Sequence, residues 1–316
     1  MTIDRALSRV PFNIDEFRCF DAAEKLRSIR PKVETGIWSA SPPLSQLLFK
    51  TLFVSICHQM NWDFLQSAMA SWLMPDPEKC LERLETTTPS EIAKLLSDYE
   101  RPERVRAAER AKLLRTTAQE LRSLLANGKL DALIYSRRLN GELGFYETMA
   151  SISAFRADEL EKKVRVLAHD LHREKVIEFT DPENLKPAVE YHILRLYLRS
   201  GRVYPTDKAV RQHLLSPRTT SRDRLVLTLR KTVEEAMNLT ALYSGMDVAA
   251  LNYVEWQIGR AVCTPEQPNC TRASPELPPD IASSSSNRCL FTNFCRAFNE
   301  PEYGLYHEPH FQKAIY

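Results

Sequence analysis

Four cysteines gather near the carboxyl end of the chain, at Cys263, Cys270, Cys289 and Cys295, in the spacing C-x6-C-x18-C-x5-C. Because we expect no secretion signal, clustered thiols of this kind are predicted to bind metal rather than to form disulfides. Zinc sites usually space paired ligands two to four residues apart, whereas loops of six and five residues suit a chain that wraps a larger inorganic core. The spacing therefore predicts an iron–sulfur cluster, with zinc or unligated cysteines as the alternatives.

The segment that leads into these cysteines, residues 254–270, resembles the corresponding segment of the helix–hairpin–helix DNA glycosylases, in the endonuclease III and adenine glycosylase branch. In that family a helix that ends in Gly-Arg, here Gly259 and Arg260, runs into two cluster cysteines six residues apart, and the last two ligands are five residues apart. The family separates its second and third ligands by two residues, where this chain has eighteen. The resemblance implies a [4Fe-4S] cluster held by the four cysteines.

The resemblance extends to residues 186–196, which look like the family's Val-Asp-x-His-apolar-x-Arg stretch with Glu190 in the place of the aspartate. Cleavage of an N-glycosidic bond builds positive charge on the sugar, and a carboxylate beneath the sugar stabilises that transition state more than the ground state. The resemblance thus implies that Glu190 is the catalytic carboxylate, which also helps to orient or activate water. In the alternative interpretation, Glu190 is an ordinary acid of a first helical turn that the helix dipole favours.

Residues 160–167 resemble the start of the family's second hairpin helix, where bifunctional members carry a lysine that forms a Schiff base. Lys163 is the better match and Lys162 the next. The family's glycine-rich hairpin is replaced here by residues 154–159, and Lys163 lies 27 residues before Glu190, farther than in the family. We therefore expect Lys163 to face solvent at a helix start, and the enzyme to be monofunctional, so that it releases a base without cleaving the strand.

Residues 55–62 resemble a helix end of the family that contains a glutamine. When a base is flipped out of the stack, a side chain is needed to fill the gap that it leaves. The resemblance implies Gln59 for this role, with His58 and Trp62 lining the base pocket. In the alternative interpretation, Trp62 is an ordinary core aromatic.

Two basic runs could follow a phosphate backbone, although the net charge of the whole chain is only +2. Residues 101–115 hold six arginines and lysines against two glutamates, and residues 218–231 hold five against one aspartate. We expect contacts with the DNA backbone from Arg104, Arg110, Arg115, Arg222 and Arg224. The alternative is that both runs are solvated helix faces.

The elements that must position these residues are helices. Only 8 of the 316 residues are glycine, which does not suit a doubly wound α/β enzyme, and alternating strand patterns are scarce. Thr88 and Glu91 form a capping box that opens one helix. Apolar residues at helical spacing predict the others, at 44–73 with a break near Asn61, 104–126, 160–175, 188–199, 222–238 and 248–262. The sequence therefore predicts an all-α fold.

The resemblance implies two helical domains, as in the DNA glycosylases. One is a barrel with a degenerate helix–hairpin–helix over residues 44–172, and the other combines residues 1–43 and 173–316 and carries the cluster. Such a protein would be a DNA N-glycosylase that hydrolyses the bond to a damaged, mispaired or modified base, with duplex DNA as its partner. The alternatives are an N-ribohydrolase that acts on a modified nucleotide or RNA, and a non-catalytic iron–sulfur protein that binds nucleic acid.

The location of the protein is also an expectation from the sequence. No run of eighteen apolar residues occurs, and Asp4 stands where a signal peptide would be basic. We therefore expect a protein without membrane contact that is cytoplasmic or, as the alternatives, nucleoid-associated or, in a eukaryote, nuclear. From the resemblance we expect a monomer.

Overall fold

The structure is a computed structural model that describes residues 10–33, 39–73, 77–156, 160–216, 220–221, 223–272, 274–284 and 288–311. It is mostly helical, with 61% of the residues in helices and 3% in strands, as the low glycine content and the helical spacing predicted. Within the described part of the chain, no helix combines the length and the apolar character that crossing a bilayer requires.

Two compact units make up the protein, and each is described by itself. Unit 1 is formed by Met1–Lys32 with Lys186–Ala314, and unit 2 by Val33–Leu185. The sequence suggested boundaries at 43/44 and 172/173. Residues 174–185 belong to unit 2 although they have no helical pattern, because Thr180 N donates to Arg137 O at 2.8 Å and Asp181 Oδ1 accepts from Leu139 N at 2.7 Å.

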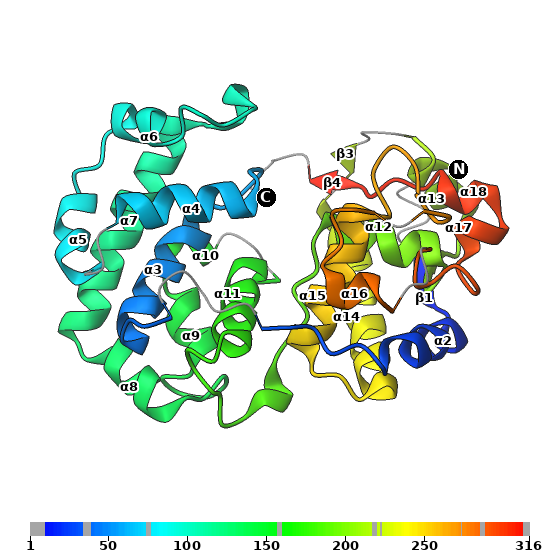
Figure 1. Ribbon diagram of the computed structural model, residues 1–316, viewed down its shortest axis with the longest axis horizontal. Coiled ribbons are helices and arrows are strands. Elements are labelled where there is room, and N and C mark those ends of the chain that lie inside the picture. The colour runs from blue at the N-terminus through cyan, green and yellow to red at the C-terminus, as the bar shows by residue number, and fades with distance from the viewer. Residues whose placement is uncertain are drawn as a thin grey trace. The chain divides into compact units, whose positions relative to one another are not determined.

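Unit 2 is built from helices around α3 (Figure 1). Its elements are α3 (Pro43–Ile56), α4 (Trp62–Trp72), α5 (Pro77–Leu84), α6 (Pro89–Leu95), α7 (Ala107–Ala126), α8 (Lys129–Ser136), α9 (Phe145–Ala150), α10 (Ser153–Arg156) and α11 (Lys162–Arg173), with the 3-10 helices η1 (Pro102–Arg104) and η2 (Pro182–Asn184). Every residue of α3 from Gln46 to Ile56 is buried. A helix that is enclosed on all sides belongs in a core, and α5, α7, α8 and α11 all contact α3.

Capping residues set the limits of the helices in unit 2. Asn61 accepts from Phe64 N at 3.0 Å and caps α4, so the apolar pattern over 44–73 forms two helices, as the break near Asn61 predicted. Gly128, with φ +65°, follows the end of α7 in the left-handed conformation that glycine adopts without strain. Thr88 and Glu91 form both hydrogen bonds of the predicted capping box at the start of α6.

Replacing Thr88 by alanine is expected to destabilise α6. The Thr88 hydroxyl accepts from Glu91 N at 3.3 Å and the Glu91 carboxylate accepts from Thr88 N at 2.7 Å, and losing such a cap costs about 1 kcal/mol. Urea unfolding should therefore show a lower midpoint for Thr88→Ala, whereas Thr88→Ser, which keeps the acceptor, should stay close to the unmodified protein. Equal midpoints for the alanine and serine variants would contradict this.

Unit 1 combines helices with two short pairs of strands. Its elements are β1 (Phe12–Ile14), α2 (Glu16–Leu26), α12 (Tyr191–Ser200), β2 (Val203–Pro205), α13 (Lys208–Leu214), β3 (Thr220–Ser221), α14 (Asp223–Ser244), α15 (Val248–Ala261), α16 (Pro279–Ala282), α17 (Arg296–Asn299), α18 (Pro301–Gly304) and β4 (His310–Phe311). β1 pairs antiparallel with β2, with Asn13 opposite Tyr204, and β3 pairs parallel with β4. The β1–β2 pair fastens the amino-terminal segment to the chain that follows α12.

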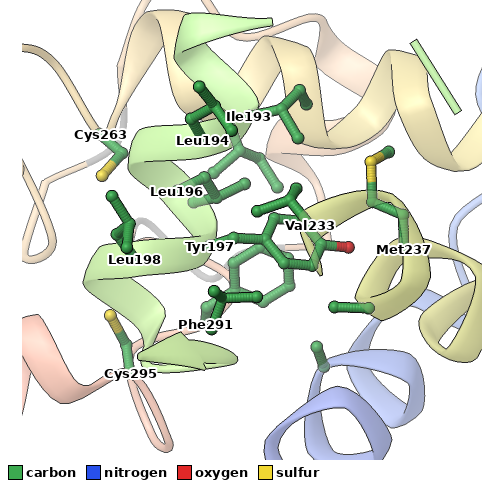
Figure 2. Packing of buried hydrophobic residues seen from close by; sticks show 14 of the residues in the cluster. Ile193, Leu194, Leu196, Tyr197, Leu198, Val233, Met237, Cys263, Phe291 and Cys295 are labelled. Atoms are coloured by element: carbon green, nitrogen blue, oxygen red, sulfur yellow. The ribbon is translucent and has the colours of Figure 1, made fainter. Parts of the chain in front are cut away.

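The core of unit 1 surrounds α12, in which every residue from Ile193 to Ser200 is buried. This helix contacts α14, α15, α17 and α18. Figure 2 shows its apolar side chains packed against residues such as Val233 and Met237 of α14. Because α12 begins at Tyr191 and is buried from Ile193 onward, the core holds the helix whose start Glu190 caps.

Candidate functional site

The four clustered cysteines line one cavity in unit 1. Its wall is formed by Cys263, Cys270, Cys289 and Cys295 together with Leu196, Ser200, Val262, Pro268, Phe291 and Ala297. Each of the four cysteines is only 6–8% exposed. Figure 2 shows Cys263 and Cys295 beside α12, whose leucines pack in the same core. The structure thus brings together the four residues that their spacing had grouped.

Backbone hydrogen bonds hold the cysteines in place although long loops separate them. Cys263 N donates to Ile258 O at 2.9 Å at the end of α15, and a β-bridge between Cys263 and Pro268 turns the chain back toward Cys270. Cys289 N then donates to Cys270 O at 2.9 Å. The two ends of the eighteen-residue loop between Cys270 and Cys289 therefore meet, and the loop leaves the cysteine framework uninterrupted.

Burial makes the thiols of Cys270, Cys289 and Cys295 hard to ionise on their own. It raises the pKa of Cys270 to about 12 and that of Cys295 to about 11, and it raises the pKa of Cys289 well above its usual range; the neighbouring thiols act in the same direction. Cysteine binds metal as the thiolate, so a group held here must bring positive charge. A charge of the protein itself also lies nearby, since Arg199 Nη1 is 3.8 Å from Cys263 Sγ.

The four thiols are donors of the kind that metals bind. In the described ranges, no group of three or more His, Cys, Asp or Glu side chains is arranged to hold a metal ion. The four cysteines do line one cavity, and cysteine thiolates are the ligands both of structural zinc and of iron–sulfur cores.

Two buried arginines of α12 bind the loop that starts at the first cysteine, Cys263. The sequence had not identified them as site residues. Arg195 Nε donates to Cys263 O at 2.6 Å. Arg199 donates to Thr264 O at 2.5 Å and to Pro265 O at 3.1 Å. A signal was present in the sequence, because two arginines four residues apart within an apolar helix share one face and therefore point to a common buried partner.

Glu190 caps α12 beside the end of α15. Its carboxylate accepts from His192 N at 2.8 Å, so Glu190 is the N-cap residue, one position before the first turn in which the alternative interpretation put it. A Cβ atom on Gly259 would lie 2.7 Å from His192 O, so glycine is what lets α15 approach α12 here. Arg195 Nη2, which lies 2.8 Å from His192 Nδ1 and 3.0 Å from Gly259 O, ties the two helix ends together.

Lys163 is buried in unit 2, and the prediction that it faces solvent is wrong. Its Nζ donates to Ser55 O at 2.8 Å, near the end of α3. Burial lowers the pKa of Lys163 below its usual value, and the charges of Lys162 and Arg110 lower it further. The neighbouring residues in the sequence are charged and gave no hint of burial, because the carbonyl that binds Lys163 lies 108 residues away. A lysine with a lowered pKa is the kind that acts as a nucleophile.

The predicted residues of the base pocket lie where α3 ends and α4 begins: His58 and Gln59 stand between the two helices, and Trp62 is the first residue of α4. His58 is only 5% exposed, and burial lowers its pKa to about 3, with nearby cations adding to the effect. Gln59 has φ +54°, a left-handed conformation that costs a non-glycine residue energy and recurs at functional sites. Trp62 packs edge-on against Phe53, with ring centroids 4.4 Å apart. This packing favours the core interpretation for Trp62.

Acid should destabilise the protein partly through His58. Because folding lowers the pKa of His58 from 6.5 to about 3, the unfolded chain binds the extra proton, and stability falls as the pH drops from 6.5 toward 3. Between pH 7 and pH 5 this contributes a loss of about 2 kcal/mol. Urea unfolding at the two pH values should show a smaller loss in His58→Gln than in the unmodified protein, and equal losses would contradict the assignment.

The arginines predicted to contact DNA differ in exposure. Arg104 and Arg224 are exposed, whereas Arg115 is half-buried and donates to Thr87 O at 2.6 Å. Arg222 lies outside the described residues.

For Arg110 the prediction is wrong. Its buried guanidinium donates to Ile56 O, to His58 O at 2.8 Å and to Val105 O at 2.8 Å. Arg110 belongs to the basic run in the sequence, but it binds carbonyls at the end of α3. A count of charges does not distinguish an arginine exposed to solvent from one that donates hydrogen bonds to backbone carbonyls.

Two sets of residues can therefore perform chemistry. In unit 1, Glu190 stands at the start of α12 beside the helix end that leads into the cysteine cavity. In unit 2, the buried Lys163 meets the end of α3 near His58. When the chain is compared with known proteins, no protein-family model and no curated protein matches it.

Proposed function

We propose that the protein is a base-excising N-glycosylase with the two-domain helical fold of the helix–hairpin–helix glycosylases. Its four clustered cysteines would hold an iron–sulfur cluster, and Glu190 would stabilise positive charge on the sugar of duplex DNA. One observation carries the proposal: the cysteines line a single buried cavity directly behind Gly259, the residue whose missing side chain lets α15 meet the start of α12. The contact between α12 and α15 thereby links the Glu190 carboxylate to the four-cysteine site.

The cysteine site has a positioning role in this proposal. When bound, a cluster supplies a rigid cross-link among the thiolates of Cys263, Cys270, Cys289 and Cys295. The chain then transmits that rigidity, because Arg195 joins Cys263 O to Gly259 O and also contacts His192. Residues that orient a functional group within a fraction of an ångström matter strongly for rate, and Arg195 is such a positioning residue for the start of α12.

The catalytic step assigned to Glu190 is electrostatic. As the bond between base and sugar breaks, C1′ and the ring oxygen share a positive charge, which a fixed carboxylate stabilises. Glu190 is fixed by its hydrogen bond to His192 N, 2.8 Å long, and the positive end of the α12 dipole favours a negative charge at this place. The same carboxylate can orient the water that attacks C1′ and accept its proton.

Strand cleavage through Lys163 is a second candidate activity, and the burial of this lysine favours it. The expectation of a monofunctional enzyme depended on a solvent-facing Lys163. An amine with a lowered pKa is uncharged in a larger fraction of molecules. Its nitrogen can attack C1′ as the base leaves with the bonding electron pair. Breaking the bond between C1′ and the ring oxygen, which becomes a hydroxyl, then gives an imine, and elimination of the 3′-phosphate from this imine cleaves the strand.

The experiment that tests the proposal is a screen of duplex oligonucleotides, each with one damaged, mispaired or modified base. Released base is measured by chromatography, and strand cleavage is measured with and without alkali. Base release that requires alkali for cleavage supports a monofunctional glycosylase. Cleavage without alkali, with a borohydride-trapped adduct that Lys163→Gln abolishes, supports the second candidate. Release from free nucleotides alone, or tight binding without release from any duplex, would overturn the glycosylase assignment.

A further inference from the structure

Two helices of unit 2 begin at the end of α3. Arg110, in the first turn of α7, donates to His58 O at 2.8 Å, and Lys163, in the first turn of α11, donates to Ser55 O at 2.8 Å. Both α7 and α11 also contact α3 along its length (Figure 1). The starts of two helices therefore converge on residues 55–58, and each contributes positive charge there.

Positive charge gathers around His58. Arg110, Lys163, Arg106 and Lys162 all lie close enough to His58 to lower its pKa. Because that pKa is held far below neutrality, His58 itself is uncharged. The carboxylate of Glu109 contacts both His58 and Arg106.

Glu109 lies where a bound anion would lie. Its Oε1 is 3.3 Å from His58 Nε2, and its Oε2 is 3.3 Å from Arg106 Nη1. The Glu109 side chain is 45% exposed, so it can swing into solvent at little cost. Glu109 is thus a weakly held internal anion that bridges a histidine and an arginine.

The imidazole of His58 is buried without a hydrogen bond. Neither of its ring nitrogens has a hydrogen-bond partner among the described residues, although Glu109 Oε1 lies 3.3 Å from Nε2. A buried polar group without a partner costs about 1–3 kcal/mol, and a native structure rarely leaves one without a reason. An acceptor oxygen in the place of the Glu109 carboxylate would satisfy the N–H that a neutral imidazole carries.

The start of α7 adds further donors. This helix has 20 residues, and its N-cap residue, Arg106, has φ +44° and provides no side-chain cap. The amides of an uncapped first turn remain available to an anion, and the helix dipole adds partial positive charge there. Arg106 and His58 therefore contact the carboxylate of Glu109, and Glu109 itself belongs to the first turn of α7.

We propose that Arg106, His58 and the first turn of α7 bind a phosphate group, which displaces the carboxylate of Glu109. A phosphate carries at least as much charge as a carboxylate and offers more acceptor oxygens, so it can contact the arginine, the imidazole and the backbone amides together. The phosphate comes from a nucleic-acid backbone or from a free nucleotide. The inference deepens the proposed function by naming a substrate contact, and it rests on that function only for the choice of these two sources.

The test measures binding of the full-length protein to three probes: inorganic phosphate, a nucleoside 5′-monophosphate and a fluorescent oligonucleotide duplex. Glu109→Gln, which removes the internal anion, should bind at least one probe about fivefold more tightly, and Arg106→Gln should bind it about fivefold more weakly. For the duplex, Arg106→Gln should also reduce the salt dependence of binding by about one ion. An effect on the duplex identifies a nucleic-acid phosphate, and an effect on the monophosphate alone identifies a nucleotide.

Matched controls are available in the same unit. Glu147 is an exposed first-turn glutamate of α9, and Arg138 is an exposed arginine. If Glu147→Gln tightens binding as much as Glu109→Gln, the effect is one of overall charge and the inference fails. It also fails if Glu109→Gln changes the affinity for none of the three probes. Because these are binding measurements, either failure would leave the base-release result of the proposed function untouched.

Discussion

Replacing Cys270 by serine is expected to abolish cluster binding and to unfold the surroundings of α12. The cysteine cavity lies within the core of unit 1, and Arg195 and Arg199 both bind carbonyls of the loop that starts at Cys263. Metal bound to cysteine sites contributes about 10–16 kcal/mol to the folding of small zinc domains, whereas a whole domain is stable by about 5–15 kcal/mol. If bound metal contributes that much to the free energy of folding of unit 1, its loss should unfold the helices around the cysteine cavity.

Iron content, visible absorption and far-ultraviolet circular dichroism would measure this. The unmodified protein should be brown, with absorption at roughly 400 nm, and Cys270→Ser should be colourless with less helix. Cys80→Ser is the matched control, since Cys80 is a buried cysteine of unit 2 that is not part of the cavity lining. Iron-free unmodified protein, purified without air and still folded, would overturn the cluster assignment, as would stoichiometric zinc.

The helices were predictable because local patterns determine them. The apolar spacing over 248–262 and the caps at Thr88 and Asn61 depend on residues within a few positions of one another, and the structure has α15, α6 and α4 at these places. The strand pair β1–β2 was not predictable. Each strand has three residues, too few for an alternating pattern, and the partners Phe12 and Pro205 lie far apart in the sequence.

The candidate site residues were likewise predictable only where a local pattern determines them. The spacing of the cysteines is local within each pair, and it correctly grouped residues that share a cavity. Lys163 and Arg110 were misread, because a charged side chain in a charged segment indicates solvent unless its distant partner is known. In both cases that partner is a carbonyl at the end of α3, a group that every residue carries and that therefore leaves no mark in the sequence.

The second large effect is expected from Glu190. Glu190→Gln should reduce base release by about 10²- to 10³-fold, the usual cost of removing one group that stabilises charge in a transition state. The amide oxygen of glutamine can still accept from His192 N, as the carboxylate does at 2.8 Å, so the start of α12 should keep its structure. Substrate binding should therefore change little, and the loss should fall on the rate of the chemical step.

Two further variants separate chemistry from structure. Asp207 is also an N-cap residue of unit 1, whose carboxylate accepts from Ala209 N at 2.7 Å, so Asp207→Asn removes a similar charge from a similar place and should leave base release nearly unchanged. Glu190→Asp keeps the charge but withdraws it by about one ångström, which can cost up to roughly 10²-fold, so its rate should lie between those of the unmodified protein and Glu190→Gln. Release by Glu190→Gln at the unmodified rate would restrict Glu190 to capping the helix, and the carboxylate that the reaction needs would have to come from elsewhere.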